Sequence, residues 1–226
     1  MRVLTFDTET TGLSKNRNAI PTPESNLTDF PHIVQFSWIF YDTETNEILD
    51  IQDKIIKVNP GTIISEKSIS IHSITYEISM AQGCPINEVI TLFIKCVDTA
   101  DLIVSHNIHF DRNMVLAEIY RLPQSHPNYF NHISFGSVTR ERFYCTMENG
   151  TELCNIPSFI NSNKMGFTKY PKLSELYKHL FFEDPVNLHN SLNDTVVCLR
   201  CFYKMHFDKD ICHKNSRMEE LINLIK

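Results

Sequence analysis

The sequence has no excess of positive charge. Its 226 residues include 21 Lys and Arg against 27 Asp and Glu, which gives a formal net charge of −6 and a pI of about 5.9. Proteins that bind duplex nucleic acid regardless of its sequence are typically basic, so charge excludes that class. A nucleic-acid ligand would need a local site in which metal ions supply the positive charge.

Long apolar runs are also absent. No run approaches the ~18 residues needed to span a membrane, and the N-terminus lacks the basic and apolar regions of a secretory leader. Seven cysteines, an odd number, do not suggest a disulfide framework. We therefore expect reduced thiols, no signal peptide, no membrane partner and an intracellular location, cytoplasmic or nuclear.

The length and composition predict one globular domain. Hydrophobic residues make up 42% of the chain and charged residues 21%, with neither an internal repeat nor a low-complexity tract. We expect a single domain over 1–226, with a core over roughly 2–206. A C-terminal helix at 216–225, opened by a capping box of Ser216 and Glu219, should pack on it.

The first dozen residues carry the strongest chemical signal. Residues 2–9 read as a strand buried on both faces, and Asp7 and Glu9 lie at its end. Side chains two residues apart on a strand share a face, roughly 6.5 Å apart along it. Paired carboxylates at a buried position need a compensating charge, and oxygen ligands without thiolates suit Mg²⁺ or Mn²⁺.

The four-residue sequence Asp-Thr-Glu-Thr at 7–10 occurs a second time in the chain, and the second copy tests this interpretation. Asp42-Thr43-Glu44-Thr45 lies between two apolar runs and precedes Asn46 and Glu47. That setting is typical of a polar hairpin loop. A D-x-E pair alone therefore does not establish a metal site, and the first copy depends on its buried strand and on motifs further along the chain.

Apolar periodicity predicts the elements that follow. A hairpin should join the second and third strands as an antiparallel meander. The segments 14–31 and 123–141 read as loops, while 148–168 has no clear pattern. The predicted strands are 33–42, 47–58, 101–105 and 142–147, and the predicted helices are 85–97, 107–121, 171–182, 191–206 and 216–225.

The second motif, His106-Asn107-Ile108-His109-Phe110-Asp111, follows the fourth predicted strand. Asn107 is a good N-cap for the next helix, and Asp111 falls in or near its first turn. A carboxylate there could hold a metal ion or simply complement the helix dipole. The spacing alone leaves both interpretations open.

The third motif, His189-Asn190-Ser191-Leu192-Asn193-Asp194, opens the helix 191–206. Ser191 with Asp194 resembles a capping box, which is the structural interpretation of Asp194. However, Asp194 shares a helical stripe with Cys198 and Cys201, and a carboxylate on an apolar face needs a partner. From the preceding loop, the His189 imidazole could fold back toward the same cavity.

Two further groups have weaker signals. Cys198-x-x-Cys201 has the spacing of half a zinc site, but both thiols sit among apolar neighbours and are expected in the core. Some basic residues could contact a phosphate backbone or be solvated surface charges. These are Arg140, Arg142, Lys164, Lys169 and Lys172.

Taken together, Phe6-Asp7-Thr8-Glu9-Thr10-Thr11-Gly12 and the motifs at 106–111 and 189–194 resemble the DEDDh 3′–5′ exonucleases. That superfamily includes proofreading subunits of bacterial replicative polymerases, ribonuclease T, oligoribonuclease and the three-prime repair exonucleases. The resemblance covers roughly residues 2–205. It departs from the usual pattern at Ser191, where the third motif usually has Ala.

The resemblance implies a role for each motif residue. Asp7 would bridge two Mg²⁺ or Mn²⁺ ions, with Glu9 and Asp194 completing one site and Asp111 holding the other. His189 would be the general base, a task that suits an imidazole near neutral pH. Further residues would contact the substrate: Thr8, Thr10, Leu13, His106 and Asn107.

The resemblance also implies a fold and a substrate. The fold is α/β, a ribonuclease H-like five-stranded mixed sheet of order 3-2-1-4-5 with helices on both faces. The implied partner is a nucleic-acid 3′ end, single-stranded or frayed, that releases nucleoside 5′-monophosphates. DNA is slightly favoured, with RNA as the first alternative. A non-cleaving nucleic-acid-binding module is the second.

Overall fold

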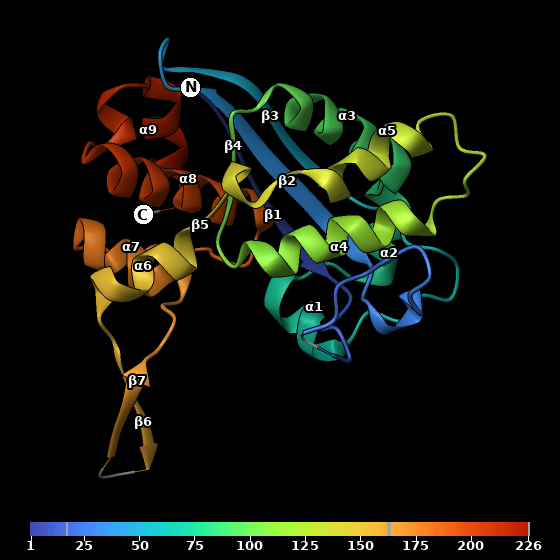
Figure 1. The fold of residues 1–226 in the computed structure, drawn as a ribbon, viewed down its shortest axis with the longest axis horizontal. Coiled ribbons are helices and arrows are strands. Elements are labelled where there is room, and N and C mark those ends of the chain that lie inside the picture. The colour runs from blue at the N-terminus through green and yellow to red at the C-terminus, as the bar shows by residue number, and fades with distance from the viewer. Residues whose placement is uncertain (17, 162–163, 226) are drawn as a thin grey trace.

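The computed structural model describes residues 1–16, 18–161 and 164–225, and its centre is a five-stranded mixed sheet (Figure 1). The strand order is β3-β2-β1-β4-β5, which confirms the expected fold. The third, fourth and fifth strands are shorter than expected. The strands are β1 (Arg2–Thr10), β2 (Ile33–Asp42), β3 (Glu47–Ile55), β4 (Leu102–Ser105) and β5 (Phe143–Cys145).

The sheet register places the first two motifs at one edge. β1 is antiparallel to β2 and parallel to β4, so β1 is an interior strand. Because β1 and β4 run in the same direction, their carboxyl ends lie side by side. The ends of these strands therefore bring Asp7 and Glu9 close to the turn that follows Ser105.

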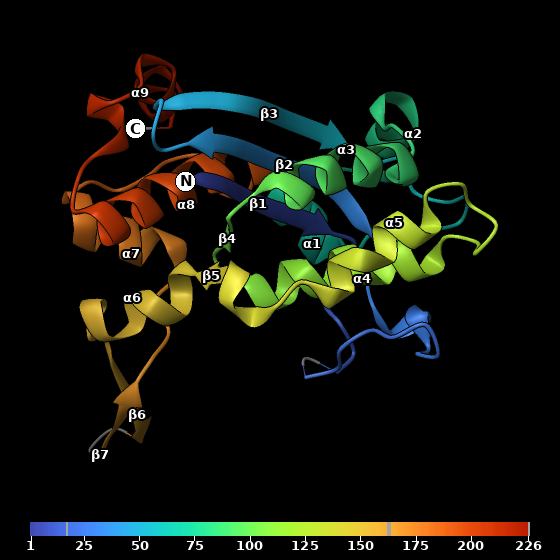
Figure 2. The same ribbon diagram turned by 45° about the horizontal axis from the view of Figure 1, so that its top comes forward.

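Helices cover both faces of the sheet (Figures 1 and 2). Leu4 and Phe6 of β1 pack against α3 and α4, while Val3 packs against α8, with α7 and α9 beyond it. The helices are α1 (Glu66–His72), α2 (Tyr76–Gln82), α3 (Ile86–Thr99), α4 (Ile108–Arg121), α5 (Tyr129–Ile133), α6 (Thr146–Cys154), α7 (Leu173–Phe181), α8 (Ser191–Phe207) and α9 (Ser216–Asn223).

Two segments contain structure that the sequence did not reveal. The expected loop 123–141 contains α5 and two short 3-10 turns. The unpatterned segment 148–168 contains most of α6 and a hairpin of β6 (Pro157–Asn161) and β7 (Lys164–Thr168). This hairpin projects from the body beside α6 and α7 (Figures 1 and 2). The side chain of Lys164 lies outside the described part of the structure.

Two helix caps differ from expectation. Asn190, not Ser191, caps α8, and its side chain accepts hydrogen bonds from the backbone N–H groups of residues 192 and 193. Asn215, not Ser216, caps α9 in the same way. In each pair the asparagine comes first and caps the helix with its amide oxygen. The Ser191 hydroxyl is instead used in a contact with β1.

The remaining sequence expectations concern the core. All seven cysteines are thiols, and Cys198 and Cys201, which belong to α8, are buried with apolar neighbours. α9 packs into the same cluster through Met218, Leu221 and Ile222. Within the described residues, no helix combines the length and apolar character that crossing a membrane requires. That residues 1–226 form a single domain stays a prediction.

Candidate metal centre

Asp7 and Glu9 share the sheet face that α8 covers. Val3, four residues before Asp7 on β1, packs under α8, and strand alternation puts both carboxylates on that side. The Ser191 hydroxyl at the start of α8 donates to the Asp7 carbonyl oxygen at 2.8 Å. The two acids therefore lie where the carboxyl end of β1 meets the first turn of α8.

Asp111 reaches the same place from α4. Asn107 adopts a left-handed conformation (φ 70°) at the N-cap, without a side-chain capping bond, and turns the chain from β4 into the helix. The Asp111 carboxylate, 3% exposed, accepts from the backbone N–H and hydroxyl of Thr8 at 3.1 and 2.8 Å and from the Ser105 hydroxyl at 2.7 Å. It is therefore anchored to β1 and β4 rather than placed in solvent at a helix end.

The third motif brings Asp194 and His189 to the acids. The His189 backbone N–H donates to Asp194 Oδ2 at 3.1 Å, which folds the preceding loop onto the first turn of α8. One potential ligand atom from each of Glu9, His189 and Asp194 lies within 4.8 Å of the others. Asp194 Oδ1 is buried and has no hydrogen-bond partner among the described residues.

The electrostatics of this cluster are unfavourable without a cation. Burial, and then the charges of Asp111, Asp194 and Glu9, raise the pKa of Asp7 well above its ordinary value. Burial, and then the charges of Asp194 and Asp111, raise the pKa of Glu9 to about 8, and burial leads the rise of the pKa of Asp194 to about 7. Burial also raises the pKa of Asp111 to about 6, although its hydrogen bonds with Ser105 and Thr8 lower it.

The donor set fits divalent cations. Carboxylate oxygens that repel one another and a buried carboxylate oxygen without a partner are both satisfied when a cation binds. The four carboxylates offer oxygen ligands without thiolate, which suits Mg²⁺ or Mn²⁺. Asp7, Glu9, Asp111 and Asp194, together with His189, are the residues that would hold or adjoin such ions.

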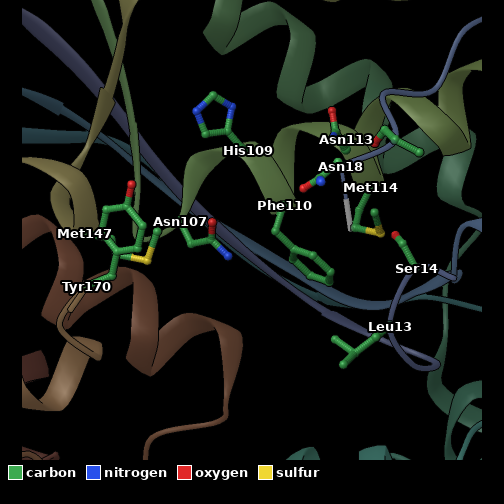
Figure 3. A pocket seen from close by; sticks show the side chains of 11 residues that line it. Leu13, Ser14, Asn18, Asn107, His109, Phe110, Asn113, Met114, Met147 and Tyr170 are labelled. Atoms are coloured by element: carbon green, nitrogen blue, oxygen red, sulfur yellow. Dashed lines mark hydrogen bonds between the residues drawn. The ribbon is translucent and has the colours of Figure 1, made fainter. Parts of the chain in front are cut away.

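A pocket of about 580 Å³ opens along the first turns of α4 (Figure 3). Asn107 and Phe110 line it from the first turn of α4, the turn that also carries Asp111. Leu13, 63% exposed, faces the same space from the segment after β1. Sequence patterning did not single out Met147 and Tyr170 as lining residues, because only the folded arrangement brings α6 and the segment after β7 to this wall.

The five expected substrate contacts fall in different places. Leu13 and Asn107 line the pocket, whereas the hydroxyl of Thr8 donates to Asp111 and that of Thr10 to the Gly12 carbonyl. The ring nitrogens of His106 contact the Thr146 hydroxyl and the Pro171 carbonyl. Burial lowers the pKa of His106 to about 4. This ring offers no unengaged polar atom to a substrate.

Two of the basic candidates are engaged within the protein. Arg142 donates to the carbonyls of Val97 and Ala100 at the end of α3, both at 2.6 Å. Lys169 forms an ion pair with Glu175 at 2.7 Å. These two side chains stabilise local structure, and Arg140, beside a separate small pocket, and the exposed Lys172 are the described candidates that remain.

Comparisons with known proteins agree with this architecture. The sequence profile of the RNase T family, described as exonuclease, matches residues 4–202. Exonuclease I from E. coli in complex with a dA16 oligonucleotide superposes with a TM-score of 0.57 at 14% identity, covering 97% of this chain and 42% of that one. Exonuclease I from Methylocaldum szegediense gives a TM-score of 0.61 at 15% identity, covering 97% and 44%.

Cell-death related nuclease 4 (CRN-4) gives a TM-score of 0.57 at 11% identity, covering 93% of this chain and 65% of that one. At these identities the likeness shows a shared fold. The chain spans less than half the length of the exonuclease I chains. A comparison with curated protein sequences gives no match.

Proposed function

The chain belongs to the RNase T exonuclease family, and from this premise we propose that it is a metal-dependent 3′–5′ exonuclease releasing nucleoside 5′-monophosphates. The observation that carries the proposal is the convergence of acids from three distant motifs. Asp7 and Glu9 come from β1, Asp111 from α4 and Asp194 from α8. Charges within this set of four carboxylates raise the pKa values of Asp7, Glu9 and Asp194, so the four groups interact electrostatically.

Each residue has a definite task in this proposal. Two divalent ions, Mg²⁺ or Mn²⁺, would supply Lewis-acid chemistry at the scissile phosphate when bound. Asp7 and Asp194 would hold them with Glu9, while Asp111, fixed by three hydrogen bonds, presents a carboxylate whose orientation is already set. An imidazole nitrogen of the exposed His189 would accept the proton of the attacking water.

The pocket supports a single-stranded or frayed 3′ end as substrate. Leu13 and Phe110 offer apolar surface for a terminal base, and stacking of this kind tolerates any base. The E. coli exonuclease I structures in complex with dA16 and dT13 oligonucleotides support single-stranded DNA. DNA is therefore the favoured substrate, with RNA as the second candidate because recognition of the 2′-hydroxyl depends on backbone and shape.

A degradation assay tests the proposal. Matched DNA and RNA oligonucleotides with a 5′ label are incubated with EDTA-stripped protein, with and without Mn²⁺. The expected result is a ladder that shortens from the 3′ end only when Mn²⁺ is present, with nucleoside 5′-monophosphates as products. Hydrolysis that persists in EDTA, or shortening from the 5′ end, contradicts it, and binding without cleavage supports the non-cleaving module.

A further inference from the structure

The sheet face under α8 carries a row of polar residues that ends at the acids. In the strand register, Asp7 lies opposite Ser37, and Ser37 lies opposite Asp53 on β3. One pair further along, Glu9 lies opposite Gln35. Directly opposed residues on antiparallel strands share a face, so this row crosses three strands, from the edge of the sheet to the metal centre.

Hydrogen bonds connect the row to α8. Gln35, 3% exposed, donates through Nε2 to Asp53 Oδ1 at 2.7 Å, and its Oε1 accepts from the Ser191 backbone N–H at 3.2 Å. The Ser37 hydroxyl donates to the same Asp53 oxygen at 2.8 Å. An ionised Asp53 only accepts and a backbone N–H only donates, so the two contacts fix which way the Gln35 amide points.

Ser191 completes the connection. Its hydroxyl donates to the Asp7 carbonyl at 2.8 Å, while its backbone N–H is held by Gln35. Asp194 lies one turn further along α8, and its carboxylate holds the His189 backbone. The contact between Gln35 and Ser191 therefore acts at the point where the third motif meets β1.

We propose that Gln35 and Asp53 are positioning residues of the metal centre, which hold the first turn of α8, with Asp194 and His189, against Asp7 and Glu9. This inference rests on the proposed function. A neutral amide gives the helix an acceptor without adding another negative charge to the acids. The charge that orients this amide belongs to Asp53, which is exposed to water and lies at the edge of the sheet.

The test compares two variants with a matched control. Gln35→Leu removes the acceptor for Ser191, and Asp53→Ala frees the Gln35 amide to rotate. The control is Asp50→Ala, because Asp50 accepts from Gln52 at 2.7 Å and from the Trp38 indole at 2.9 Å on the same strand pair. Trp38 packs on the opposite sheet face, in the α3 and α4 cluster, so the control breaks an equivalent Gln–Asp contact away from the acids.

Mn²⁺ binding, measured by electron paramagnetic resonance, and steady-state kinetics on a single-stranded oligonucleotide are the readouts. We expect Gln35→Leu and Asp53→Ala to weaken Mn²⁺ binding by about 10- to 100-fold and to lower kcat, with KM changed less than about threefold. Asp50→Ala should stay within about twofold of the wild type in both, and thermal unfolding reports the stability of every variant.

A rescue pair separates positioning from general support of the fold. Gln35→Glu alone sets a carboxylate against Asp53 and should weaken Mn²⁺ binding. Adding Asp53→Asn restores a donor for Glu at 35 and should recover binding to within about fivefold of the wild type. Recovery supports the inference.

The inference is overturned if Gln35→Leu and Asp53→Ala match the Asp50→Ala control in Mn²⁺ affinity and kcat, or if the rescue pair binds no better than Gln35→Glu. A wild type that binds Mn²⁺ but cuts neither DNA nor RNA overturns the proposed function alone, and the binding measurements still decide the positioning role. A wild type that binds no Mn²⁺ overturns both.

Discussion

At the scale of single residues, the first question is how His189 contributes. A nitrogen of its ring lies within 4.8 Å of oxygens of Glu9 and Asp194, close enough to share their cation or to take a proton beside it. The backbone of His189 adopts a left-handed conformation (φ 72°) and donates to Asp194, so the loop is shaped to bring the ring back to the acids. The geometry allows both roles, and resemblance to the DEDDh exonucleases favours the base.

Substitution of His189 by Gln separates these roles. As a general base, His189 contributes about 10²- to 10⁴-fold to the rate, so His189→Gln should lose hydrolysis on that scale while keeping Mn²⁺ affinity within about threefold. Single-turnover kinetics and an Mn²⁺ titration measure the two quantities. Loss of Mn²⁺ affinity in parallel with activity would instead identify the imidazole as a ligand.

The same scale shows what the sequence could and could not predict at the site. Local pattern marked Asp7, Glu9, Asp111 and Asp194 as candidates, because each stands next to a strand end or a helix start. Their combination in one site was implied by the resemblance to the DEDDh exonucleases. The N-cap of α8 could not be predicted, because both Asn190 and Ser191 are good N-cap residues. The serine hydroxyl instead contacts β1, which is distant in the sequence. The structural role of Arg142 could not be predicted either, because it donates to carbonyls at the end of α3, which are distant in the sequence.

At the scale of elements, the segment between β1 and β2 is fastened to α4. Buried Glu118 accepts from His32 Nδ1 and the Ile33 N–H, both at 3.1 Å, and pairs with Arg121 at 2.9 Å. Arg121 in turn donates to the carbonyls of Leu27 and Phe30. Nearer the pocket, Asn113 of α4 donates to the carbonyl of Ala19 in the same segment, and both residues line the pocket with Leu13.

Substitution of Glu118 by Gln tests this attachment. Burial opposes ionisation of Glu118, but the hydrogen bond from His32, the charges of Arg121 and His32 and the Ile33 N–H lower its pKa overall. A lowered folded-state pKa stabilises the fold above the unfolded value near 4.5, and this contribution is lost as the pH falls through the folded value.

We expect Glu118→Gln to cost about 3 kcal/mol of unfolding free energy at pH 7, because it leaves Arg121 without its buried partner. The difference from wild type should shrink below pH 4. Urea unfolding at both pH values measures it. Glu220→Gln, which breaks the exposed pair with Arg217 at the same i,i+3 spacing, is the control and should cost under about 1 kcal/mol. Equal losses in the two variants would contradict the attachment.

The strand order 3-2-1-4-5 was implied by the resemblance to the DEDDh exonucleases. Local pattern predicted the hairpin of β2 and β3 and the strand β4 before a recognisable helix start. The hairpin of β6 and β7 was not predictable. Its strands lie outside the five-stranded sheet, so its residues show no apolar alternation imposed by the main core. The wall that Met147 and Tyr170 add to the pocket escaped prediction for the same reason.

At the scale of the whole molecule, folding brings several carboxylates close together, and a bound cation would neutralise their charge. The unfolded-state pKa values of Asp and Glu lie near 4, whereas in the fold the pKa values of Glu9 and Asp194 are about 8 and 7. Between these limits the folded state binds more protons than the unfolded state, so without metal its stability should fall as the pH rises from 5 to 8. A bound cation would remove this loss.

Thermal unfolding of the wild type and of Asp7→Asn at pH 8, in EDTA and in Mn²⁺, tests the central claim most directly. In EDTA the variant should melt higher by about 3 °C or more, because it no longer buries an acid whose pKa folding raises well above the unfolded value. Mn²⁺ should raise the Tm of the wild type and leave that of the variant nearly unchanged. An Asp7→Asn protein that melts lower in EDTA and gains as much from Mn²⁺ as the wild type would contradict a cation site built on these acids.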